Sequence, residues 1–131
     1  MTAAIERNTL LRPRIQRHRR LMHTLEIEVR GEVVAERARS HDISAGGMFV
    51  DSAQDYLTGM VLRLRFTLGE REFETRARVV HVRPQMGFGA QFLDLDAEQR
   101  NYILRFVHQQ RATREAERLM RNNRWEAQRR R

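Results

Sequence analysis

The sequence of 131 residues predicts a mainly β domain, a small closed antiparallel β-barrel followed by one C-terminal α-helix. Three observations lead to this fold class. Apolar and polar residues alternate in six or seven short runs, glycine-bearing turns separate the runs, and the apolar spacing becomes helical only after residue 96. Closure is favoured over an open sheet because a closed barrel has no exposed strand edge.

The first two runs predict a hairpin. Residues 23–30 alternate with period two and place three apolar side chains on one face, namely Leu25, Ile27 and Val29. Gly31-Glu32 has the glycine-first pattern of a two-residue turn. Residues 33–39 are therefore expected to return as the partner strand.

The central part of the chain predicts two more strands. Residues 40–47 are polar and contain two glycines, which is typical of a loop, and residues 48–50 form a short apolar strand behind it. After a connection at residues 51–59, residues 60–67 alternate again with period two.

A second hairpin and a last strand complete the predicted barrel. Gly69-Glu70 turns the chain into residues 72–83, where the alternation changes phase and makes Val80 and Val82 the apolar pair. A β-bulge near Val79 accounts for this change. Residues 87–92 alternate glycine, alanine and phenylalanine, so their glycines are expected where only small residues fit.

The C-terminal segment predicts a helix. Asp96 and Gln99 have the spacing of a capping box, and apolar residues follow at helical spacing, namely Tyr102, Ile103, Phe106 and Val107. This stripe is expected to pack on the barrel. Beyond residue 111 it thins, and the pattern is expected to end at Asn122-Asn123.

The net charge of +8 lies at the two ends of the chain. Residues 1–20 hold six arginines and one acid, residues 111–131 hold eight arginines and three acids, and residues 21–110 carry a net charge of −2. We therefore expect a flexible arginine-rich leader, a barrel with its closing helix, and a basic helical extension over these ranges. Every basic residue is arginine, whose planar guanidinium binds phosphate or the guanine edge through two hydrogen bonds.

Several classes of function are disfavoured. The chain has no cysteine, which excludes disulfides, thiolate metal sites and a cysteine nucleophile. Its five histidines do not have metal-ligand spacings, no catalytic or phosphate-loop motif occurs, and helix capping explains Asp94 and Asp96 better than acid–base catalysis. No apolar run approaches the roughly 20 residues of a membrane span. We therefore expect a cytoplasmic protein that is not an enzyme and has no metal or cofactor.

The turn from Asp42 to Gly47 is the densest polar segment. Its glycines allow positive φ angles, which would let consecutive backbone N–H groups converge on an anion, with the Ser44 hydroxyl as a further donor. The other interpretation is an Asx-turn in which Gly46 and Gly47 only make a bend.

This turn and its surroundings resemble the PilZ domain family. The resemblance rests on Asp42-x-Ser44-x-x-Gly47 followed by Met-Phe-Val, an arginine cluster about twenty residues upstream, the Gly-Phe-Gly-Ala-Gln-Phe strand at 87–92, and the closing helix from Ala97. It covers roughly residues 12–110. PilZ domains are receptors for the bacterial second messenger cyclic di-GMP and have a six-stranded antiparallel barrel, so the resemblance implies a ligand sensor with this fold.

The resemblance also implies which residues bind the ligand. In the family, an Arg-x-x-x-Arg leader wraps the ligand against the turn; here Arg20 stands at the second arginine and Gln16 at the first. The implied cyclic di-GMP site consists of leader and turn residues, namely Gln16, Arg17, Arg19, Arg20, Asp42, Ser44, Gly46 and Gly47. Losing one bidentate contact to guanine costs about 1–3 kcal/mol, which four neighbouring arginines are placed to offset, namely Arg12, Arg14, Arg17 and Arg19.

Three functions fit these observations. In the first, cyclic di-GMP orders the leader across the barrel and thereby signals to a protein partner that controls motility or biofilm formation. In the second, a PilZ-like adaptor acts through protein contacts without the ligand. In the third, a small barrel with two basic arms binds nucleic acid, although its strands show no exposed aromatic pair for base stacking.

Overall fold

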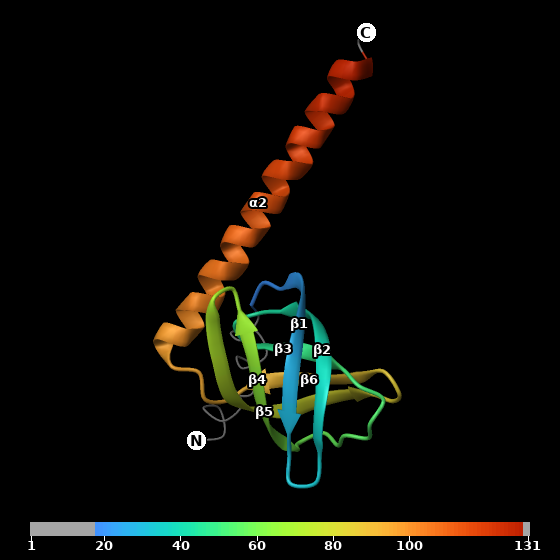
Figure 1. Cartoon of the computed structure of the whole chain (residues 1–131), viewed down its shortest axis with the longest axis vertical. Coiled ribbons are helices and arrows are strands. Elements are labelled where there is room, and N and C mark those ends of the chain that lie inside the picture. Colours follow the sequence, from blue (N-terminus) through green and yellow to red (C-terminus); the bar gives the residue numbers. More distant parts are fainter. Residues whose placement is uncertain (1–17, 130–131) are drawn as a thin grey trace, which may run out of the picture.

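In the computed structural model, which describes residues 18–129, six antiparallel strands form a closed barrel from which one long helix projects (Figure 1). Along the chain the elements are β1 (Leu21–Arg30), β2 (Ala35–Ile43), β3 (Gly47–Asp51), β4 (Val61–Leu68), β5 (Arg71–Arg83), β6 (Gly87–Phe92) and α2 (Ala97–Arg129). The strands are hydrogen-bonded in the order β1-β2-β3-β6-β5-β4, and β4 pairs with β1. The predicted fold class is confirmed.

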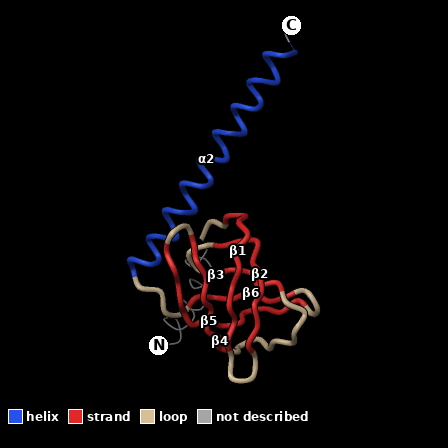
Figure 2. The backbone as a smooth tube through the Cα atoms, viewed as in Figure 1, coloured by secondary structure: helices blue, strands red, loops and turns tan. Residues whose placement is uncertain are grey.

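The barrel interior follows from the period-two patterns. Along β4 every second side chain is buried, and in the paired strand β5 the inward residues up to Val79 are also buried. Phe73 is fully buried and stacks on Phe66 with ring centroids 5.3 Å apart. Figure 2 shows the strands curving into a barrel while the far half of α2 extends away from the barrel.

The first hairpin differs from the prediction in its turn. The connection between β1 and β2 has four residues, Gly31 to Val34, and is closed by a hydrogen bond from the Gly31 N–H to the Val34 carbonyl (2.7 Å). Val33 is 92% exposed at the tip. The predicted two-residue turn is wrong because the pairing of Arg30 with Ala35 sets the register of the hairpin and leaves Val33 outside the ladder.

The predicted loop over residues 40–47 is also shorter in the structure. β2 continues to Ile43, because Ser40 and Ile43 face the interior and are fully buried, and β3 already begins at Gly47. The connection is reduced to residues 44–46. A buried serine hydroxyl that bonds to the carbonyl of Asp42 (2.7 Å) lets a polar residue remain inside the strand.

The predicted bulge in β5 is confirmed. The pairing with β6 shifts between Val79, which faces Ala90, and His81, which faces Gly89. Val80 is the bulged residue and is 44% exposed. The prediction that Val80 and Val82 form an apolar pair is therefore wrong, because only Val82 packs against the core. After the bulge the outward face of β5 carries His81.

The start of α2 has the predicted capping box. The Gln99 N–H donates to the Asp96 carboxylate (2.7 Å), and the Asp96 N–H donates to the Gln99 side-chain oxygen (3.0 Å). Ile103 and Val107 of the apolar stripe are buried against the barrel.

In its C-terminal half α2 extends beyond the end of its apolar stripe. It continues through Asn122-Asn123 to Arg129, because two asparagines cost only about 1 kcal/mol of helix propensity among strong helix formers. Within residues 18–129 no helix is both long and apolar enough to cross a membrane.

His23 should make the stability of the fold depend on pH. Burial, and secondly the charge of Arg114, lower the pKa of His23 from its ordinary value of 6.5, and its ring lies edge-on to Phe106 at 5.3 Å. The unfolded chain therefore binds this proton more readily, so stability is complete above about pH 6.5 and falls as the pH drops below it. Thermal unfolding between about pH 7 and 5 should show this loss, and His23→Phe should reduce it. An unchanged pH dependence in the variant would contradict the assignment.

Candidate ligand-binding site

Asp42 joins the leader to the barrel. Arg20 directly precedes β1, and its Nη1 lies 2.9 Å from Asp42 Oδ2; the side chains are 53% and 20% exposed. The other carboxylate oxygen, Oδ1, accepts a hydrogen bond from the Phe49 N–H (2.9 Å). The structure therefore brings together two of the predicted site residues, with Asp42 holding the Arg20 guanidinium in position.

Ser44 closes the turn from within. Its hydroxyl is buried, accepts hydrogen bonds from the N–H groups of Gly46 and Gly47 (3.2 Å each), and donates to the Gly47 carbonyl (3.3 Å). Positive φ occurs at other glycines of the described chain but not at these two. Of the two interpretations of this turn, the structure supports the bend, because the N–H groups of Gly46 and Gly47 are satisfied inside the turn and do not converge on an anion. The glycines instead make a simple bend, closed by a serine side chain.

Gly47 has a packing role. A Cβ built on Gly47 would lie 1.9 Å from the carbonyl oxygen of Ala90, so only glycine allows β3 to approach β6 at this point. The turn is also anchored by a hydrogen bond from the Phe92 N–H to the Gly46 carbonyl (2.9 Å). Gly46 and Gly47 therefore fix the position of the turn between the strands that carry Asp42 and Phe49.

The remaining predicted residues belong to the leader. Arg19 is exposed and lines a large cavity between the leader and α2. Gln16 and Arg17 lie outside the described residues.

A cavity of about 380 Å³ lies beside the Arg20–Asp42 pair. Its lining includes side chains that the sequence analysis did not single out, namely Met22, His41, Phe49, Asp51, His81 and Arg83. The rings of Phe49 and His81 stack at 5.9 Å, and the Arg83 guanidinium lies 5.5 Å from the Phe49 centroid.

The sheet register explains why these groups meet. Phe49 of β3 and His81 of β5 both pair with Gly89 of β6, which has no side chain to separate the two rings. A Cβ at Gly89 would lie 2.1 Å from the His81 ring. The bulge after Val79 was the available sequence signal, since it turns His81 and Arg83 to the outer face.

The cavity beside the Arg20–Asp42 pair is called the groove from here on. Its chemistry suits an anion that carries flat rings. Its lining has two guanidinium groups, from Arg20 and Arg83, which bind phosphate oxygens well, beside the carboxylates of Asp42 and Asp51. The rings of Phe49 and His81 are the aromatic groups of the lining on which a flat ligand can stack. In the described part of the chain, no three histidine or acidic side chains are placed to hold a metal ion.

Residues 14–109, almost three quarters of the chain, match the PilZ domain family. The chain belongs to this family. The resemblance seen in the sequence is thus confirmed, and PilZ domains are ligand-binding receptor domains rather than catalytic ones.

Solved structures of other PilZ proteins share the fold. The chain is similar to the motility inhibitor MotI/DgrA of Bacillus subtilis, with a TM-score of 0.67 and 23% identity over 74% of this chain and 51% of MotI. It is also similar to Escherichia coli YcgR in complex with c-di-GMP, with a TM-score of 0.65 and 18% identity over 79% of this chain and 50% of YcgR. The PilZ chain therefore spans about half the length of these two proteins. A search of curated proteins found no match.

Proposed function

We propose that this PilZ domain is a receptor for cyclic di-GMP and binds it in the groove beside the Arg20–Asp42 ion pair. The observation that carries the proposal is this pair, which places a leader arginine against the family turn. Membership of the family supports the proposal, as do the structures of YcgR and of Borreliella burgdorferi PlzA, each solved in complex with c-di-GMP. The chain is similar to PlzA with a TM-score of 0.56 and 16% identity, over 79% of this chain and 47% of PlzA.

Each side of the groove has a role in the proposed complex. Arg20 and Arg83 bind phosphate or the guanine edge, and Phe49 and His81 stack on guanine. Asp42 orients Arg20, while Ser44, Gly46 and Gly47 hold the turn that presents Asp42. Gln16, Arg17 and Arg19 close over the ligand as the leader becomes ordered.

The signal is proposed to pass to a protein partner. A leader ordered by the ligand changes the surface next to α2, whose extension exposes Leu119, Met120 and Trp125 for contact. The proposal includes the division into leader (1–20), barrel (21–110) and basic extension (111–131). It also includes a cytoplasmic location and control of motility or biofilm formation.

Isothermal titration of the full chain with cyclic di-GMP tests the proposal. Binding is expected with a Kd below about 100 μM, and cyclic di-AMP should bind more weakly because adenine lacks the O6 acceptor that arginine recognises. An absence of heat at this concentration would contradict the receptor function. Equal binding of both dinucleotides, lost at about 150 mM salt, would instead indicate nonspecific binding of polyanions.

A further inference from the structure

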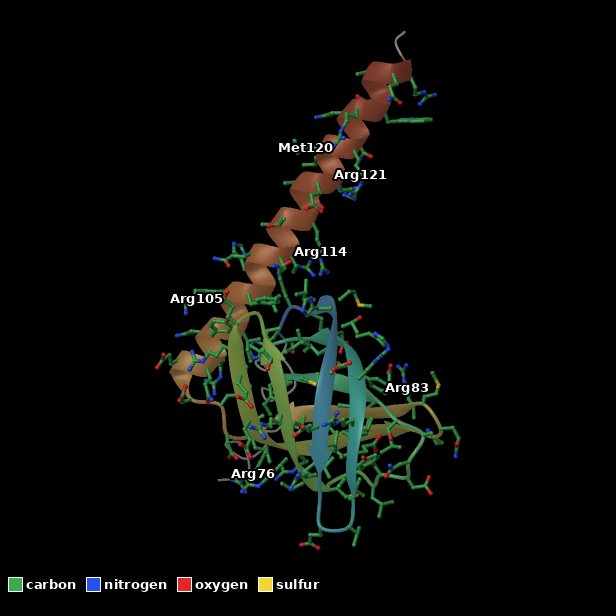
Figure 3. All side chains as sticks on the ribbon, viewed as in Figure 1. Arg76, Arg83, Arg105, Arg114, Met120 and Arg121 are labelled. Carbon is green, nitrogen blue, oxygen red and sulfur yellow. The ribbon has the colours of Figure 1, made fainter. Side chains whose placement is uncertain are left out.

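Two arginines of α2 reach back to the junction between the leader and β1. Arg111 Nη1 donates a hydrogen bond to the backbone carbonyl of Arg20 at 2.7 Å, and Arg114 Nη1 donates to the carbonyl of Met22. Figure 3 shows Arg114 projecting from α2 next to the start of β1. The edge-on contact of His23 with Phe106 fastens the same stretch of β1 to α2.

Arg20 is thereby held at both ends. Its guanidinium is paired with Asp42 of β2, and its backbone carbonyl is bound by Arg111 of α2. The direction in which a long side chain leaves the backbone depends on the backbone position, so a residue held at only one end would sample a wider range of orientations. The α2 contacts therefore bear directly on where the Arg20 guanidinium lies.

Two further arginines of α2 lie in the same cavity as Arg111 and Arg114 and can be compared with them. A cavity of about 990 Å³ between the leader and α2 is lined by Arg111 and Arg114 and also by Arg118 and Arg121. Arg118 is paired with Glu115 on its own helix at 2.6 Å. Within residues 18–129, the side chain of Arg121 makes neither a hydrogen bond nor an ion pair, so it shares the charge of this cavity but does not bind the backbone of Arg20 or Met22.

We propose that Arg111 and Arg114 are positioning residues of the cyclic di-GMP site, through which α2 sets the orientation of Arg20. The proposal rests on the proposed function, which it extends to the helix outside the groove. Coupling between two sites is reciprocal, so ligand bound at Arg20 should in turn strengthen the hold on α2 near residue 111. The helix extension would thereby receive the signal.

Binding measurements on matched variants test the proposal. Arg111→Met with Arg114→Met keeps the aliphatic stems but removes both donors, and this double variant should bind cyclic di-GMP about tenfold more weakly. Arg121→Met removes one charge from the same cavity and should change the Kd by less than about twofold. Lysine at both positions restores a charged donor and should recover most of the affinity. Equal losses in the Arg114→Met and Arg121→Met single variants would overturn the proposal in favour of simple charge attraction.

Hydrogen exchange without ligand tests the hold on the leader separately. In the double methionine variant, the peptide over residues 18–24 should exchange faster than in the unmodified chain and in Arg121→Met, with unchanged exchange in β4 and β5. If the unmodified chain binds no cyclic di-GMP but this difference appears, the proposed function fails while the contact between α2 and the leader stands. Unchanged exchange over residues 18–24 would overturn the positioning role, whatever the ligand affinity.

Discussion

Replacement of Arg20 by alanine is expected to weaken cyclic di-GMP binding by roughly ten- to a hundredfold. Its guanidinium is positioned by Asp42 at the mouth of the groove and is half exposed, so it has N–H donors left for a ligand. One bidentate contact to guanine or phosphate contributes about 1–3 kcal/mol, which corresponds to this loss of affinity. Isothermal titration of the variant against the unmodified chain measures it.

The stability of the fold should hardly change in the same variant. An ion pair this exposed contributes at most about 1 kcal/mol, so the thermal midpoint should fall by only a few degrees. Arg105→Ala, on an exposed turn of α2, is a charge-matched control that should keep full affinity. Equal affinities for the Arg20→Ala and Arg105→Ala variants would show that Arg20 does not contact the ligand.

Gly47→Ala is expected to destabilise the barrel by about 3 kcal/mol or more. Its Cβ would meet the backbone oxygen of Ala90 at 1.9 Å, and a backbone atom between two paired strands cannot move without opening the β3–β6 ladder. The shift would also disturb the Ser44 hydroxyl, which accepts the Gly47 N–H. Chemical denaturation gives the free energy of unfolding of both chains.

Gly89→Ala is the matched control for this substitution. It lies in β6, opposite Phe49, but the nearest atoms to its Cβ belong to the ring of His81, a side chain that can rotate, and not to the backbone. Its free energy of unfolding should fall by no more than about 1 kcal/mol. If the two alanine variants unfold at the same denaturant concentration, the close approach of β3 and β6 does not explain Gly47.

The barrel could be predicted because its patterns are local. The alternation along residues 60–67 indicates which face of a strand is buried, and the spacing of Asp96 and Gln99 indicates the N-terminal cap of a helix. Neither prediction needs knowledge of a distant residue. The turn after Arg30 was predicted wrongly because the register of two strands, rather than the two residues Gly31-Glu32, sets its length. For the same reason the outward position of Val80 became clear only from its pairing with β6.

The candidate site was predictable in part. Asp42 and Arg20 were found from the resemblance, and their ion pair follows from the pairing of Met22 with Asp42. The role of Ser44 could not be predicted, because a hydroxyl in a glycine turn can face a ligand or its own backbone equally well. His81 and Arg83 carry no motif of their own, and they reach the groove only because β6 lies between β3 and β5.

By itself the amino-acid sequence determined that this chain forms a small β-barrel with a capped helix, charged at its two ends and carrying the turn of the PilZ domain family. These properties depend on neighbours within a few residues of one another. The tertiary structure alone decided which side chains share the groove and that Arg111 and Arg114 of α2 bind the backbone of Arg20 and Met22, where the leader meets β1. Such contacts join residues that lie tens of positions apart, and their geometry is set by strand register and helix docking, which no local pattern encodes.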